Sequence, residues 1–181
     1  VQRGAEEAGG GAIIPDPARL PFDEEVPQRP ESPYAAAKVA QEALGRAWWA
    51  SYGLPVVRVR LFNLIGPGQD ERYVASSFAK QAAAIAMGLS PPRLEVGDLR
   101  VARDFLDWRD GLEAMIGAAE LGAPGEVYNI CSGTPRPLKE LLDFYLADAG
   151  ITPEIVAPEH LARPGQALLR ENDEELKTIV K

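Results

Sequence analysis

The sequence predicts an α/β fold whose sheet is at least partly parallel. Short segments rich in β-branched residues alternate with longer segments of helical periodicity across residues 34–149. Glycine or proline separates most of these segments, and 46% of the 181 residues are hydrophobic, enough to bury a sizeable core. Strands that alternate with helices are typical of units in which a helix connects two parallel strands.

Residues 1–33 are expected to form an extended or disordered junction loop. Residues 1–11 contain four glycines without a regular spacing of apolar residues, and residues 14–33 contain six prolines. Because proline fixes φ and removes a backbone donor, neither helix nor sheet is favoured there. The folded α/β portion is therefore expected in residues 34–181.

The first helix is predicted over Tyr34–Tyr52. Ser32 can cap its free amide groups, and Pro33 suits its first turn. Gly53 provides the residue at which this alanine-rich helix ends.

A β-branched strand is predicted over Pro55–Phe62, followed by the turn Gly66-Pro67-Gly68. Arg58 and Arg60 alternate with valines in this strand. We therefore expect one face of the strand to be less buried than the other.

The remaining elements follow from the spacing of apolar residues. The predicted helices are Val74–Met87 (which Gly88 ends), Trp108–Leu121, Leu138–Ala149 and a last one at Glu174–Val180. The further predicted strands are Leu94–Val96, Arg103–Leu106 and Glu126–Cys131.

Composition argues against several classes of protein. Nineteen basic and 27 acidic residues give a net charge of −8, which disfavours nucleic-acid binding but leaves room for a small phosphate-binding pocket. The apolar runs are too short to cross a membrane, and the chain does not open with a secretory leader pattern. One cysteine, Cys131, and one histidine, His160, predict neither an internal disulfide nor a metal site. A soluble, cytoplasmic protein is expected.

Tyr34 and Lys38 form the candidate catalytic pair. Residues four apart lie on one face of a helix, so the two side chains are expected to be neighbours. A phenol exchanges protons poorly at neutral pH, and an adjacent ammonium favours its ionised form, which suits proton transfer to a carbonyl. The same spacing fits a surface helix with a snorkelling lysine, so the pair alone leaves both interpretations open.

Four motifs, in order along the chain, resemble the extended short-chain dehydrogenase/reductase family of nucleotide-sugar epimerases, dehydratases and reductases. They are Pro30-Glu-Ser-Pro-Tyr34-Ala-Ala-Ala-Lys38, Leu61-Phe-Asn63-Leu-Ile-Gly66-Pro67-Gly68-Gln69, Arg103-Asp104-Phe105-Leu-Asp107 and Val127-Tyr-Asn129-Ile-Cys-Ser132-Gly133. Within the family, the chain is most similar to reductases of GDP-4-keto-6-deoxymannose. The resemblance implies a partial Rossmann-like, doubly wound parallel sheet with a small C-terminal substrate-binding α/β region, so residues 34–181 would be the C-terminal portion of such a domain.

The resemblance also implies an NAD(P)-dependent oxidoreductase that reduces a 4-keto nucleotide sugar by hydride transfer. Tyr34 would donate the proton to the sugar carbonyl, and Lys38 would hold the nicotinamide ribose. Leu61, Asn63 and Leu64 would pass beside the nicotinamide, with the Asn63 amide reaching the sugar or a phosphate. Alternatively, Asn63 only stabilises the turn that follows it.

By the same resemblance, a GDP-sugar or other nucleotide sugar would be the ligand. Arg103 and Arg163 would clamp its diphosphate through their guanidinium groups, whereas the alternative for each arginine is a surface salt bridge. Phe78 and Lys80 would line the nucleotide pocket, although a phenylalanine on a helix is more often part of the core.

Two features of the family have no counterpart in the sequence. No Gly-x-x-Gly-x-x-Gly turn for a cofactor pyrophosphate is present, and residues 5–11 offer no serine or threonine for the substrate carbonyl. The cofactor-binding half is therefore interpreted as missing. The chain could be a reductase completed by another segment, an inactive remnant that binds a sugar nucleotide, or half of a 4,6-dehydratase or 4-epimerase. The choice between NAD and NADP also stays open.

The helix with Tyr34 is expected to make a further contact. Ala37, Ala40, Leu44 and Trp48 lie near one side of it and should pack on the sheet or in a dimeric helix bundle. In the family this helix commonly lies at the dimer contact, so the resemblance implies a homodimer through the Tyr34 helix.

Overall fold

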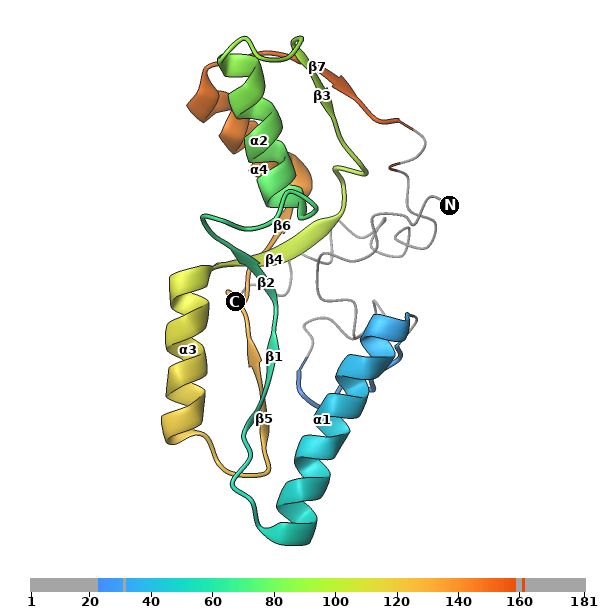
Figure 1. The fold of residues 1–181 in the computed structure, drawn as a ribbon, viewed down its shortest axis with the longest axis vertical. Helices are drawn as coiled ribbons and strands as arrows, with labels where there is room; N and C mark the ends of the chain where they lie inside the picture. Colours follow the sequence, from blue (N-terminus) through green and yellow to red (C-terminus); the bar gives the residue numbers. More distant parts are fainter. Residues whose placement is uncertain (1–22, 31, 159–160, 162–181) are drawn as a thin grey trace. The chain divides into compact units, whose positions relative to one another are not determined.

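The computed structural model describes residues 23–30, 32–158 and 161, which divide into two compact units (Figure 1). The first unit takes its described residues from Val1–Leu64 and Phe105–Gly133, and the second from Ile65–Asp104 and Thr134–Lys181. Each unit thus combines two stretches that are distant in the sequence. Within the predicted junction loop, residues 23–30 contain a turn and neither helix nor strand.

The first unit is built on two parallel strands, β1 (Arg58–Leu61) and β5 (Val127–Ile130), whose residues pair one to one in order. Helices α1 (Pro33–Tyr52) and α3 (Trp108–Leu121) lie on opposite sides of this strand pair (Figure 1). Parallel strands need a long crossover, and here the chain between β1 and β5 includes α3. The predicted parallel pairing is confirmed.

The ends of α1 follow the predicted capping chemistry. The Ser32 hydroxyl accepts a hydrogen bond from the Ala35 amide at 3.0 Å, and Pro33 opens the helix. Gly53 follows the last residue with φ of 66°, a left-handed conformation that favours glycine. These caps fix Tyr34 in the first helical turn.

Glycines let α3 approach the strands closely. A Cβ atom on Gly111 would lie 2.5 Å from Leu64 Cδ2, and one on Gly122 would lie 2.9 Å from Val57 Cγ1. At Gly111 the Leu64 side chain or the helix would have to move, and a Cβ on Gly122 would first meet the Ala118 carbonyl oxygen, at 2.3 Å.

The second unit packs α2 (Val74–Ala86) against α4 (Leu138–Ala149). It also contains the parallel strands β3 (Arg93–Glu95) and β7 (Glu154–Val156). Its core is a cluster of side chains that are at most 3% exposed, namely Phe78, Leu94, Val96 and Leu142.

A three-stranded sheet has the order β2 (Asn63–Ile65), β4 (Ala102–Asp107) and β6 (Pro135–Pro137). Strands β4 and β6 are antiparallel, and Arg103 lies opposite Arg136. The chain passes from one unit to the other within β2 and again within β4.

The helices α1 to α4 begin and end within one residue of their predicted bounds. The predicted strand Pro55–Phe62 is shorter in the structure, and the three-residue strands β2, β6 and β7 were not predicted. The predicted helix Glu174–Val180 lies outside the described residues. None of the helices in the described part of the chain is long and apolar enough to cross a membrane.

Candidate active site

Tyr34 and Lys38 lie next to each other on the first two turns of α1. The Lys38 Nζ lies over the Tyr34 ring at 5.7 Å from its centroid, within the range of a cation–π contact. Tyr34 is 45% exposed, and Lys38 is exposed as well. The structure therefore brings the predicted phenol and ammonium together and leaves both open to a ligand.

Small residues form much of the contact between α1 and the strands. Ala35 is the single buried residue of α1, and the Cβ position of Gly45 lies 3.3 Å from the Val56 side chain. Further along, the Trp49 indole lies so close to Gly125 that a Cβ there would collide with it. The contact thus combines small residues with one large aromatic ring, that of Trp49.

Three large apolar residues of α1 lie on its exposed side. Leu44 is 58% exposed, Trp48 51% and Tyr52 77%, and the Trp48 and Tyr52 rings are 5.4 Å apart. Of the two packing alternatives expected for Leu44 and Trp48, packing on the sheet does not occur in the structure. This stripe at four-residue spacing is available to another surface.

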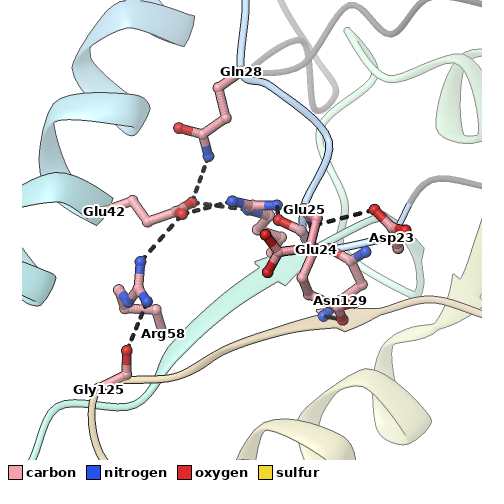
Figure 2. A network of polar contacts seen from close by, with 9 residues as sticks. Asp23, Glu24, Glu25, Gln28, Glu42, Arg58, Gly125 and Asn129 are labelled. Atoms are coloured by element: carbon pink, nitrogen blue, oxygen red, sulfur yellow. Dashed lines mark hydrogen bonds and ion pairs between the residues drawn. The ribbon is translucent and has the colours of Figure 1, made fainter. Parts of the chain in front are cut away.

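An ion-pair network joins α1 to β1. Glu42 accepts from Arg60 Nη2 at 2.7 Å on one carboxylate oxygen and from Arg60 Nε at 2.9 Å on the other. Arg58 Nη1 lies farther away, at 3.4 Å, while its Nη2 donates to the Gly125 carbonyl at 2.7 Å. Figure 2 shows Glu42 between Gln28 and Arg58.

The arginines of β1 correct one expectation from the sequence. Alternation with valine predicted a less buried strand face, but the side chains of Arg58 and Arg60 are only 12–13% exposed. Both guanidinium groups lie within ion-pair distance of the Glu42 carboxylate on the overlying helix, and Arg58 also donates to the Gly125 carbonyl, which lowers the cost of burying them. The hydrogen bond from Arg60 lowers the pKa of Glu42, against the opposing effect of burial, and the same pairing raises the pKa of Arg60.

The segment before α1 joins the same network. Gln28 Nε2 donates to Glu42 at 2.7 Å, and Arg60 Nη1 donates to the Glu24 carbonyl at 2.8 Å. The Glu24 carboxylate accepts from the Asn129 backbone amide at 2.7 Å, and Asn129 is the register partner of Arg60. We call residues 23–28 the strap, since they are bound to α1, β1 and β5 together (Figure 2).

The residues predicted beside the nicotinamide lie at the end of β1 and in β2. Leu61 and Leu64 are half-buried, with side-chain atoms close to Gly111 of α3. Asn63 is the first residue of strand β2, and two residues separate it from the turn that begins at Gly66. Helix α3 thus packs against Leu61 and Leu64, the two leucines predicted to lie beside the nicotinamide.

Arg103 and Arg163 are the two arginines predicted to bind the substrate, and the structure describes only the first of them. Arg103 is half-buried in β4, and its Nη1 donates to the Ala102 carbonyl at 3.0 Å. Arg163 lies outside the described residues. Sequence analysis missed Arg136, which the antiparallel register places opposite Arg103 and which pairs with Glu140 at 3.2 Å. Like charges opposite each other destabilise a strand pair. The pairing of Arg103 with Arg136 could not be predicted from the sequence, because it depends on the register of β4 and β6.

The two residues predicted on α2 occupy different environments. Phe78 is 2% exposed and belongs to the core of the second unit, so its side chain is not open to a ligand in this structure. The structure thus shows Phe78 in the core, the alternative named from the sequence, and a contact of Phe78 with a nucleotide stays a prediction. Lys80 is exposed and paired with Glu71, in a shallow depression that also includes the ion pair of Arg72 and Asp70.

A metal centre is not indicated by the part of the chain that the structure describes. Its histidine, cysteine, aspartate and glutamate side chains do not gather in groups of three or more suited to a metal ion. Cys131 is exposed and forms no disulfide.

Comparison with known sequences supports the resemblance. The family model for GDP-mannose 4,6-dehydratase matches residues 16–175. The GDP-6-deoxy-D-mannose reductase of Pseudomonas aeruginosa is 42% identical over 154 residues, 84% of this chain and 51% of that protein. The dTDP-D-glucose 4,6-dehydratase of Homo sapiens is 31% identical over 131 residues, 69% of this chain and 33% of that protein. The chain spans about half or less of the length of these curated relatives.

Solved structures show the same fold. The structure of RMD from Pseudomonas aeruginosa in complex with NADPH matches with a TM-score of 0.80 and 39% identity, covering 90% of this chain and 56% of that chain. A UDP-N-acetylglucosamine 4-epimerase from Methanobrevibacter ruminantium, in complex with UDP-N-acetylmuramic acid, matches with a TM-score of 0.73 and 29% identity, covering 86% and 49%. The predicted fold class, a partial Rossmann-like α/β fold with parallel strands, is confirmed.

Proposed function

The chain belongs to the GDP-mannose 4,6-dehydratase family of extended short-chain dehydrogenases/reductases, and from this premise we propose that it supplies Tyr34 and Lys38 to an NAD(P)-dependent reductase of a GDP-4-keto-6-deoxy sugar. The main support is the Lys38 ammonium, 5.7 Å from the centroid of a half-exposed tyrosine ring. The 42% identity to a GDP-6-deoxy-D-mannose reductase favours this substrate class.

In the proposed reaction, the Tyr34 hydroxyl donates its proton to the oxygen of the sugar ketone as that oxygen gains negative charge. A positioned phenol can do so when a cation stabilises the phenolate that remains. Lys38 would provide that cation from the next turn of the same capped helix, where its Nζ lies over the Tyr34 ring.

The accessible Tyr34–Lys38 pair also fits the ribose of a nicotinamide dinucleotide. The ammonium offers three donors and the phenol offers a donor and an acceptor, which suits a pair of ribose hydroxyls. When bound, the cofactor supplies the hydride. We propose that a further polypeptide segment binds its pyrophosphate, because the sequence contains no Gly-x-x-Gly-x-x-Gly turn.

We propose that Arg103 and Arg163 bind the diphosphate of the nucleotide sugar, because guanidinium groups suit phosphate oxygens. The antiparallel register places Arg136 opposite Arg103, which makes it a further candidate for this contact. Asn63 stays a proposed sugar or phosphate ligand, and Leu61 and Leu64 proposed neighbours of the nicotinamide.

A 4,6-dehydratase or 4-epimerase is the second candidate, since dTDP-glucose 4,6-dehydratases and a UDP-glucose 4-epimerase match at 28–35% identity. A dehydratase also needs an acid and a base for removal of water. Product analysis distinguishes the candidates: a reductase consumes one NAD(P)H per sugar, whereas a dehydratase or epimerase leaves the cofactor unchanged overall.

We further propose a cytoplasmic homodimer that forms through α1. The exposed stripe of Leu44, Trp48 and Tyr52 has the four-residue spacing of a helix–helix contact. Light scattering tests this proposal, and a monomer at every concentration would contradict it.

Calorimetric titration tests the ligand assignment on the full chain. We expect a GDP-sugar to bind, the Arg103→Ala variant to bind at least about tenfold more weakly, and NADPH not to bind tightly. The matched control is Arg93→Ala, which removes an exposed arginine from strand β3 of the same unit. Equal affinities of the Arg103→Ala and Arg93→Ala variants would reject the role of Arg103.

A further inference from the structure

Glu42 lies two helical turns after Tyr34 and one after Lys38, on the same stripe of α1. Its carboxylate makes a two-point contact with Arg60 at 2.7 and 2.9 Å, and its side chain is only 17% exposed. Such a fork fixes orientation as well as distance, because two parallel hydrogen bonds allow little rotation.

Near Tyr34, apolar packing restrains the rotation of α1 about its own axis only weakly, because the buried residue there is an alanine. The buried residue of the helix is Ala35, and Gly45 offers no side chain to the strand. The large side chain of α1 that packs against the strand segment is Trp49, whose indole lies at Gly125, far along the helix from Tyr34. The ion pair with β1 therefore adds a restraint closer to Tyr34 than that packing.

Arg60 extends this restraint to the chain before the helix. Its third guanidinium nitrogen donates to the Glu24 carbonyl of the strap, whose side chain accepts from the Asn129 amide. Gln28, at the other end of the strap, donates to Glu42 itself. Tyr34 is thus held from both sides along the chain, six residues after Gln28 and eight before Glu42.

From these contacts we infer that Glu42 is a positioning residue, which acts through Arg60 to fix where the first turn of α1 presents Tyr34. The inference rests on the proposed function for its significance, because it assigns no direct contact with substrate or cofactor to Glu42. A buried ion pair often contributes little net stability over apolar residues of the same size, so a role in geometry is the more specific explanation.

Native-state amide hydrogen exchange, measured by NMR on the folded full chain, tests this inference. In Glu42→Gln we expect the amides of Asn129 and Ala35, which report the strap and the helix cap, to exchange about tenfold faster. The amides of Arg58 and Phe62, which bond to Glu126 and Ile130 in the neighbouring strand segment, should keep their rates. A merely stabilising role would accelerate all four amides together.

Two further variants keep the test decisive. Asp143→Asn is the matched control, because it neutralises an exposed carboxylate paired with Lys139 on α4 and should change none of these rates. Glu42→Met combined with Arg60→Met removes one charge of each sign, so the net charge of the network is kept and Arg58 retains its hydrogen bond to the Gly125 carbonyl, yet the variant should still release Asn129 and Ala35. Unchanged exchange at these two amides, or uniform acceleration of all four, would overturn the inference whether or not the proposed reductase activity exists.

Discussion

The substitution Gly111→Ala gives the sharpest test of the packing between α3 and the strand segment with Leu61 and Leu64. The added Cβ would lie 2.5 Å from Leu64 Cδ2, whereas ordinary contacts begin at 3.4 Å. Leu64 or the helix must therefore move by about 0.9 Å. Overpacking of this kind costs about 1–3 kcal/mol, and the gain in helix propensity from glycine to alanine is about 1 kcal/mol.

The net expectation is a loss of up to about 2 kcal/mol in the free energy of unfolding, measured by urea titration of the full chain. Gly117→Ala is the matched control on the same helix, because its Cβ would have no neighbour within 4 Å. That variant should gain about 1 kcal/mol from propensity alone. If Gly111→Ala stabilised the chain as much as Gly117→Ala does, the close approach of α3 to Leu64 would be refuted.

Two further predictions concern the core of the second unit and the cap of α3. Leu94 is fully buried, so Leu94→Ala should lower the free energy of unfolding by about 2–5 kcal/mol, whereas Leu89→Ala, at a 73% exposed residue, should change it by less than about 0.5 kcal/mol. Asp107 caps α3, and its hydrogen bonds with the Arg109 side chain and amide lower its pKa from 3.8 to about 2. Because the pKa of Asp107 is lower in the folded chain than in the unfolded one, Asp107 stabilises the fold above pH 3.8 and loses this effect as the pH falls towards 2. In thermal melts, Asp107→Asn should therefore lose less stability on acidification than the unchanged chain. An identical pH dependence of the two would contradict this cap.

Local signals in the sequence were sufficient for the helices. Ser32, Pro33 and Gly53 act on residues adjacent to them, so the bounds of α1 could be predicted without knowledge of the fold. Strands β6 and β7 have only three residues each, and β6 contains two prolines, so their pairing depends on partners far away in the sequence.

The site shows the same division between local and distant contacts. The proximity of Tyr34 and Lys38 follows from helical spacing and could be predicted. The burial of Arg58 and Arg60 could not, because Glu42, the carboxylate that both contact, precedes them by 16 and 18 residues and meets them only through packing. For Phe78 the sequence leaves a pocket and the core open, because a phenylalanine on a helix suits both, and only its neighbours in the fold show that it lies in the core.

Turnover of a 4-keto-6-deoxy GDP-sugar with NADPH is the most direct test of the proposed role of Tyr34. The chain would be assayed together with the part of the Pseudomonas aeruginosa reductase that it does not match, supplied as a second polypeptide. Tyr34→Phe should lower turnover at least about a hundredfold with little change in sugar-nucleotide affinity, while Tyr52→Phe, on the last residue of the same helix, should leave both unchanged. Full turnover by the Tyr34→Phe assembly would contradict the assignment of Tyr34 as the proton donor.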